Sequence, residues 1–206
     1  MTRGLFITLE GGEGAGKTTS IAFVRAFLEQ AGKKVLVTRE PGGTPMGEKI
    51  RGLLLEGSEA MHADTELLLM FAARAEHVTR VVQPALAAGT YVVCDRFTDA
   101  TYAYQGGGRG VPAARIAALE EWVQQGLRPD LTLLLDIPVD QGLQRAGQRS
   151  APDRFEREAR DFFERVRQAY LAIAAREPRR VKIIDASKDI IRVEQQLRAV
   201  LETLVR

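Results

Sequence analysis

The chain has 206 residues, 45% of them hydrophobic and 27% charged, which is typical of one folded domain and excludes a disordered or collagen-like chain. The formal net charge of +2 argues against a protein dedicated to binding nucleic acid. A single cysteine, Cys94, excludes an intrachain disulfide, and with only two histidines a Cys/His metal cluster cannot be built. Neither a membrane-spanning apolar run nor a signal-peptide pattern is found, so we expect a cytoplasmic protein that contacts no membrane.

Short apolar segments alternate with helical patterns in the first half of the chain. A strand is expected at residues 5–9, followed by an amphipathic helix that stops at Gly32. Further strands are expected at 35–37 and 91–94, with a helix buried on several sides at 67–73 between them.

The second half continues this alternation. Strands are expected at residues 131–135 and 181–184, and apolar stripes predict amphipathic helices over 155–173 and 190–204. Strands separated by helices pair in parallel and bind ligands at their carboxyl ends. We therefore predict a single α/β domain over residues 1–206, built on a five-stranded, parallel, doubly wound sheet.

The strongest motif is Gly11-Gly12-Glu13-Gly14-Ala15-Gly16-Lys17-Thr18, which fits the phosphate-loop pattern G-x-x-x-x-G-K-[ST] between an expected strand and an expected helix. Its glycines let successive backbone N–H groups point inward, and the helix adds its positive N-terminal end. Lys17 would supply charge for the β- and γ-phosphates, and the Thr18 hydroxyl would hold Mg²⁺. We expect ATP at these residues and at Thr19.

The loop alone leaves several classes of nucleotide-dependent protein open. The chain contains no asparagine, so it lacks the Asn-Lys-x-Asp loop with which a classical GTPase reads guanine. A kinase for a phosphorylated acceptor needs a second cationic site, and Arg96 could supply one by binding a phosphate bidentately. The adjacent Asp95 could orient Mg²⁺ through water or accept a hydrogen bond at the acceptor site, and a structural ion pair is the alternative for these two residues. A nucleotide-driven switch or assembly ATPase remains the alternative, and the turn from Arg39 to Gly43 fits a purely structural role as well.

Further runs make the chain resemble thymidylate kinases over nearly its whole length. The most specific are Arg39-Glu40-Pro41-Gly42-Gly43-Thr44 and Tyr104-Gln105-Gly106-Gly107-Gly108-Arg109-Gly110. The resemblance implies a phosphate-loop nucleoside-monophosphate kinase fold with a mobile lid. It also implies the transfer of phosphate from Mg-ATP to dTMP, giving dTDP for dTTP biosynthesis, by a homodimer that binds no nucleic acid. Another nucleoside-monophosphate or deoxynucleoside kinase of similar build is the alternative enzyme.

The resemblance also implies a role for each matching residue of the acceptor site. Phe71 would stack on thymine, Arg74 would bond the edge of the base, and Tyr104 would exclude a ribose hydroxyl. Phe71 and Tyr104 could instead be ordinary core aromatics. The full set of expected acceptor residues is Arg51, Phe71, Arg74, Arg96, Thr101, Tyr104 and Gln105.

Catalysis would depend on cations and a metal ion. Arg51 and Arg96 would hold the acceptor phosphate, Glu40 and Asp95 would organise Mg²⁺ and its waters, and Thr18 and Asp95 would be the metal ligands. The expected catalytic set is Lys17, Glu40, Asp95, Arg96 and Arg149.

The phosphate loop departs from that of some family members, which carry an arginine beside its acid. Bacterial members with a loop like Glu13-Gly14-Ala15 place catalytic arginines in a lid instead, at residues 145–156 here. Three arginines lie in this segment: Arg145, Arg149 and Arg154. Arg149 is the best candidate for the catalytic arginine, and a structural ion pair is the alternative for Arg154.

Three further expectations concern local features. Cys94 lies in an apolar strand and is expected to be a buried small hydrophobe, whereas the sequence identifies no carboxylate partner for His62 or His77. The glycines at 106–110 are expected to form a mobile loop. Residues 185–188 resemble the family's segment beside adenine.

Overall fold

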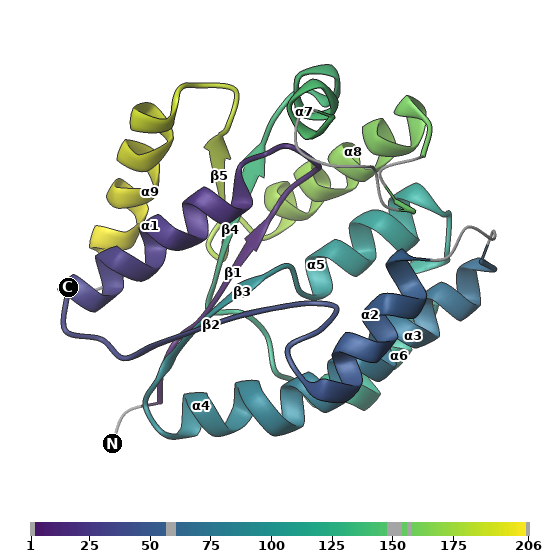
Figure 1. The fold of residues 1–206 in the computed structure, drawn as a ribbon, viewed down its shortest axis with the longest axis horizontal. Helices are drawn as coiled ribbons and strands as arrows, with labels where there is room; N and C mark the ends of the chain where they lie inside the picture. The colour runs from purple at the N-terminus through teal and green to yellow at the C-terminus, as the bar shows by residue number, and fades with distance from the viewer. Residues whose placement is uncertain (1–2, 57–60, 148–153, 156–157, 205–206) are drawn as a thin grey trace.

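The computed structural model describes residues 3–56, 61–147, 154–155 and 158–204 (Figure 1). Its elements run in the order β1 (Phe6–Glu10), α1 (Lys17–Gln30), β2 (Val35–Arg39), α2 (Pro45–Leu55), α3 (Ala63–His77), the π-helical turn η1 (Val78–Val82), α4 (Gln83–Ala87), β3 (Tyr91–Asp95), α5 (Thr98–Thr101), the π-helical turn η2 (Tyr102–Gly108), α6 (Ala113–Gln124), β4 (Leu131–Asp136), α7 (Val139–Ala146), α8 (Arg160–Arg176), β5 (Val181–Asp185) and α9 (Ile190–Leu204).

The strands form one sheet in the order β2-β3-β1-β4-β5, with every neighbouring pair parallel. In the central strand, Ile7 pairs with Val93 of β3 and with Leu131 of β4. The predicted fold class is therefore confirmed.

Four strands continue one residue beyond their predicted ends and finish on an acid. These residues are Glu10, Asp95, Asp136 and Asp185. The apolar pattern marks only the buried part of a strand, whereas the hydrogen-bonded ladder extends to the polar edge where ligands of such sheets bind.

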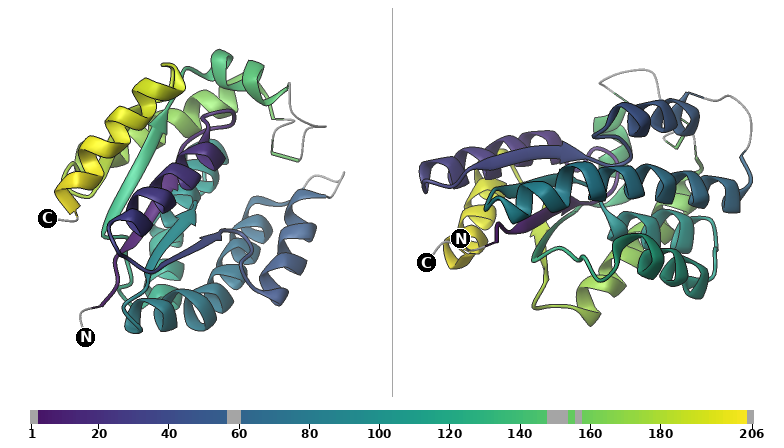
Figure 2. Two further views of the ribbon diagram at one scale, coloured as in Figure 1. Left: turned by 60° about the vertical axis from the view of Figure 1, so that its left-hand side comes forward. Right: turned by 90° about the horizontal axis from the view of Figure 1, so that it is seen from below.

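Helices cover both faces of the sheet (Figures 1 and 2). On one face α1 and α9 contact each other, and Leu28 and Leu197 share a core cluster with Ile7. On the other face α8 packs against β4 and β5, and α4 packs against β3. Helices α2, α3 and α6 form a separate group in which α3 contacts both of the others.

The helix predicted over 155–173 begins later than its apolar stripe suggested. Helix α8 starts at Arg160, because Ala159 has extended backbone angles. Phe155 precedes the helix and is nevertheless buried in the same cluster as Phe162 and Tyr170. The stripe therefore marked a buried surface correctly but not the extent of the helix.

The expected mobile loop at 106–110 is also wrong in part, because Gly106, Gly107 and Gly108 belong to η2. A Cβ on Gly107 would lie 2.7 Å from the Ala169 Cβ, and one on Gly108 would meet the Phe162 ring. These glycines allow the backbone to approach α8 closely. Gly107 and Gly108 thus pack against α8, whereas Gly110 is exposed.

Candidate active site

A cavity of about 270 Å³ opens where the loops after β1, β2 and β3 meet. It brings together most of the residues predicted from the sequence. Those on its wall are Glu13, Gly14, Ala15, Gly16, Lys17, Thr18, Glu40, Arg51, Arg74, Asp95, Arg96, Thr101, Tyr104 and Gln105.

The phosphate loop connects the buried strand β1 to helix α1. Lys17 Nζ donates to the carbonyls of Gly11 at 3.1 Å and Gly12 at 3.0 Å, so the ammonium group lies across the loop. Burial and the charge of Arg96 lower the pKa of Lys17. Gly14 has φ +67°, and a Cβ there would meet the carbonyl oxygen of Gly142, so this position requires glycine. The loop thereby keeps the N-terminus of α1 accessible to an anion.

Glu13 links the phosphate loop to the other side of the cavity. Its Oε1 accepts hydrogen bonds from Arg96 Nη2 at 2.5 Å and from the Tyr104 hydroxyl at 2.9 Å. Burial would raise the pKa of Glu13, but the charges of Arg96 and Lys17 outweigh burial and hold it at about 2. The carboxylate of Glu13 therefore contacts the part of the cavity that holds Arg96 and Tyr104, whereas the sequence predicted for it only a contact with ATP.

Arg96 is held in an unusual backbone conformation directly after β3. Its φ is +66°, in the left-handed region that costs a residue other than glycine about 1–3 kcal/mol. Its N–H donates to the Leu9 carbonyl at 3.0 Å, and the N–H of Phe97 donates to Glu10 Oε1 at 2.7 Å. The buried Cys94 thiol donates to the Arg96 carbonyl at 3.0 Å, which agrees with its expected structural role. These contacts fix the direction in which the guanidinium leaves the chain.

Positive charges crowd the part of the cavity near Arg96. Arg51 Nη1 donates to the Pro41 carbonyl at 2.9 Å, and burial together with the Arg39 charge lowers the pKa of Arg51. Among the described residues, Asp95 Oδ1 is buried without a hydrogen-bond partner. The region therefore favours an anion, and a buried carboxylate oxygen beside it suits a divalent cation.

Arg74 of α3 forms the opposite wall and is almost fully buried. Its Nε donates to Glu40 Oε2 at 2.7 Å, and its Nη2 donates to Thr101 Oγ1 at 2.9 Å. Its Nη1 is buried and has no partner within the part of the chain that the structure describes. This N–H group can donate to a carbonyl oxygen of a ligand. Gln105, also on this wall, donates its amide to the buried Glu66 at 2.8 Å.

Phe71 does not lie where the resemblance placed it. The side chain is 2% exposed and packs with Leu67 and Ile116, and the described wall of the cavity contains Met70 instead. Successive residues of a helix point about 100° apart, so a shift of one position moves a side chain from the cavity to the core. Phe71 is therefore a core aromatic, the alternative left open by the sequence. Met70 shares a helix face with Arg74, four residues on.

Glu40, expected to organise Mg²⁺ and its waters, lies on the cavity wall, and its role toward Mg²⁺ stays a prediction. Its Oε2 accepts from Arg74 Nε at 2.7 Å, and its Oε1 lies 2.8 Å from His77 Nδ1. The partner of His77 went unnoticed because Glu40 lies far away in the sequence. Arg74 and His77 are three residues apart, which places both side chains on one face of a helix. This spacing was the available signal that the two residues could share one carboxylate partner.

A family model for thymidylate kinase matches residues 9–197 of the chain. This chain belongs to the thymidylate kinase family. It is 58% identical to the thymidylate kinase of Pseudomonas putida (strain GB-1) over 203 residues, which cover 98% of this chain and 97% of that protein. It is 57% identical to the thymidylate kinase of Ectopseudomonas mendocina (strain ymp), with the same coverage.

A solved structure of thymidylate kinase from Ehrlichia chaffeensis has a similar fold, with a TM-score of 0.79 and 33% sequence identity over 97% of this chain and 99% of that one. The predicted family is confirmed, and with it the kinase activity of the family, the phosphorylation of dTMP to dTDP.

Two of the three arginines proposed for the thymidylate kinase lid are described by the structure. Arg145 donates to the Ala186 carbonyl at 2.9 Å. Arg154 donates to the fully buried Glu66 at 2.6 Å, which is the structural ion pair left open above. Arg149 lies outside the described residues, and its role stays a prediction.

A second cavity, of about 250 Å³, lies beside the first turn of α1. Its wall includes Gly16 and Thr19 from that turn and Ala186 and Lys188 from the segment after β5. This is the segment that the resemblance to thymidylate kinases places beside adenine.

Proposed function

We propose that the phosphate loop binds the phosphates of ATP, that the cavity at the ends of β1, β2 and β3 binds dTMP, and that the phosphoryl group passes between them. The contact of Glu13 with Arg96 carries this proposal, because it joins the donor loop to a cation-lined acceptor cavity. Arg51 and Arg96 bind the acceptor phosphate. Catalysis then depends on positioning and on charge neutralisation.

The base lies on the wall formed by α3 and α5. Arg74 Nη1 donates to a carbonyl of thymine, and Met70 contacts the ring in place of Phe71. Thr101 and Gln105 line the base and sugar side of the pocket.

Thr18 and Asp95 would hold Mg²⁺. The unpartnered buried oxygen of Asp95 fits a cation, and Thr18, the second residue of α1, lies on the same cavity wall. Mg²⁺ commonly binds one or two protein oxygens together with substrate phosphates. It therefore needs no larger acidic cluster, and none is found among the described residues. When bound, Mg²⁺ would neutralise charge on the β- and γ-phosphates, as would Lys17.

ATP consumption should require an acceptor and should depend on the thymine methyl group. We expect kcat/KM for dUMP to be about 10–200-fold lower than for dTMP, which is what one buried carbon contributes to selectivity. ADP release measured with dTMP, with dUMP and without acceptor tests this. A nucleotide-driven switch would hydrolyse ATP equally with and without dTMP, and equal kcat/KM for dUMP and dTMP would contradict the base-pocket assignment.

Tyr104 is expected to select deoxyribose. Its ring makes edge contacts with Phe155, Phe162 and Tyr170, and its hydroxyl bonds Glu13. Tyr104→Ala should raise activity on the ribonucleotide relative to dTMP, whereas Tyr104→Phe retains the ring and should keep the ratio. Because loss of a buried aromatic side chain costs about 3–5 kcal/mol, the measurement is the ratio of kcat/KM values, with Tm recorded alongside. An unchanged ratio in Tyr104→Ala would leave Tyr104 as a packing residue.

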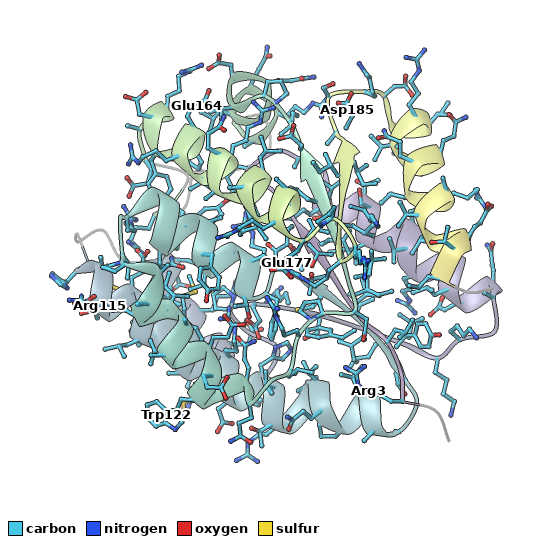
Figure 3. The ribbon with its side chains drawn as sticks, turned by 180° about the vertical axis from the view of Figure 1, so that it is seen from behind. Arg3, Arg115, Trp122, Glu164, Glu177 and Asp185 are labelled. Atoms are coloured by element: carbon cyan, nitrogen blue, oxygen red, sulfur yellow. The ribbon has the colours of Figure 1, made fainter. Side chains whose placement is uncertain are left out.

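A homodimer in the cytoplasm completes the proposal. Helices α2, α3 and α6 carry exposed apolar side chains, among them Leu53, Leu68 and Trp122. Trp122 is 76% exposed and points away from the ribbon (Figure 3). Exposed apolar side chains of this kind suit contact with a second copy of the chain. Within the described residues no helix is both long and apolar enough to cross a bilayer.

A further inference from the structure

A buried chain of polar side chains lies behind Arg74. Thr38 Oγ1 and His77 Nε2 are 2.7 Å apart, His77 Nδ1 and Glu40 Oε1 are 2.8 Å apart, and Glu40 Oε2 accepts from Arg74 Nε at 2.7 Å. His77 is fully buried, and Glu40 and Arg74 are at most 5% exposed. This series of hydrogen bonds thus connects the end of β2 to the cavity wall through two residues of α3.

The chemistry of Glu40 fixes the direction of these hydrogen bonds. Burial would raise the pKa of Glu40, but Arg74 and the hydrogen bond to His77 outweigh it, so the pKa is lowered and the carboxylate is ionised. An ionised carboxylate only accepts, so His77 Nδ1 must carry a proton and donate it. In the neutral imidazole, Nε2 then accepts from the Thr38 hydroxyl.

The same arrangement determines how Arg74 is presented to the cavity. Glu40 binds Nε and Thr101 binds Nη2, so the planar guanidinium cannot rotate without breaking a charge-assisted hydrogen bond. The guanidinium also lies 4.7 Å from the centre of the Phe71 ring, which restricts movement out of its plane. The amino group at Nη1, which has no partner among the described residues, is left for a ligand.

The loop after β2 is closed tightly over His77. A Cβ on Gly43 would lie 2.6 Å from His77 Cδ2 and 2.7 Å from Thr38 Oγ1. The imidazole therefore has a single position, between the loop on one side and Glu40 on the other.

We propose that His77 is a positioning residue that, through Glu40, orients Arg74 so that its unpartnered Nη1 amino group recognises a carbonyl oxygen at position 4 of the base. The inference rests on the proposed contact of Arg74 with thymine and assigns its specificity to a residue that does not touch the substrate. A base with an amino group at position 4 would present hydrogens to this fixed donor. Discrimination between the two bases therefore depends on His77.

The test compares dTMP with 5-methyl-dCMP, which keeps the methyl group and sugar but replaces the carbonyl at position 4 by an amino group. In His77→Phe the ring volume remains and the donor to Glu40 is lost. We expect KM for dTMP to rise and the ratio of kcat/KM for dTMP over 5-methyl-dCMP to fall by about tenfold or more, the size of one hydrogen bond to a charged group. We expect kcat to stay within about threefold of its original value.

Two matched variants separate positioning from stability. His77→Asn places an amide donor near the original Nδ1 and should restore much of the ratio, which also provides a measurement if His77→Phe fails to fold. Thr38→Val is nearly isosteric and removes only the hydrogen bond on the far side of the imidazole. It should lower Tm while leaving the ratio close to that of the unaltered chain.

Arg74→Ala distinguishes failure of this inference from failure of the proposed function. A reduced ratio in Arg74→Ala and in His77→Phe supports both. A reduced ratio in Arg74→Ala alone overturns the role of His77 and leaves the base contact intact. An unchanged ratio in Arg74→Ala overturns the proposed base contact and the inference with it. Equal falls in the ratio for Thr38→Val and His77→Phe at equal Tm would show a general effect of stability and also overturn the role of His77.

Discussion

Arg149→Ala should lower kcat by roughly 10²-fold or more, the low end of what a catalytic arginine contributes to phosphoryl transfer. The migrating phosphoryl group spreads negative charge over its equatorial oxygens, while Lys17 and Mg²⁺ act on the β–γ side. The phosphate loop has glycine at position 14 where some family members have an arginine. Among the arginines of the expected lid, Arg145 and Arg154 are engaged by a backbone carbonyl and by Glu66.

Steady-state kinetics on Arg149→Ala and Arg149→Lys, with dTMP binding followed by calorimetry, test this expectation. The lysine variant should recover little activity, because an ammonium group cannot form the two parallel hydrogen bonds that a planar guanidinium donates to a phosphoryl group. Arg160→Ala is a suitable control, since Arg160 is an exposed arginine that pairs with Asp140 on the surface. If kcat of Arg149→Ala stays within about threefold of the original, Arg149 is not the catalytic arginine. Loss of dTMP affinity with kcat unchanged would make it a ground-state contact.

Arg96→Ala should reduce kcat/KM for dTMP by roughly 10²-fold or more, because it removes a cation that can bind the acceptor phosphate bidentately and each hydrogen bond to a charged group contributes about 1.5–3 kcal/mol. The substitution also removes the cation that pairs with the partly buried carboxylate of Glu13. It leaves the backbone strain at this position unchanged, since alanine and arginine are equally disfavoured at φ +66°. The effect should therefore appear in dTMP binding.

Calorimetric titration with dTMP and, separately, with an ATP analogue provides the measurement. Affinity for dTMP should fall much more than affinity for the analogue. Arg25→Ala, in an exposed pair with Glu29 on α1, should change neither. Affinity for dTMP within threefold of the original in Arg96→Ala would contradict the assignment of the acceptor phosphate.

The phosphate loop and the sheet could be predicted from the sequence because their signals are local. The loop residues form one continuous run, and each strand is a short apolar segment whose neighbours follow from the parallel, doubly wound class. The position of Asp95 and Arg96 follows equally simply, because the carboxyl ends of β1 and β3 lie side by side.

Contacts between distant segments could not be predicted in the same way. Glu40 and His77 meet only because the loop after β2 folds onto α3, and no periodicity connects them. The choice between Met70 and Phe71 depends on the rotation of α3 about its axis, which a motif does not specify. The glycines of η2 illustrate a third limit, since composition alone does not distinguish a flexible loop from close backbone packing.

The central place of β1 affects the order of events while the chain is being synthesised. β1 is synthesised before the other strands. Ile7 can pair with Val93 on one side and with Leu131 on the other only after those residues have been synthesised. Parallel pairing between such distant segments is slow and leaves strand edges exposed in the meantime. Nucleotide cannot assist the earliest stages, because the loop that binds it is anchored on a strand still lacking both neighbours. A nascent chain that has not yet completed β4 therefore still exposes one edge of β1, and ATP can stabilise the fold only after that edge is paired.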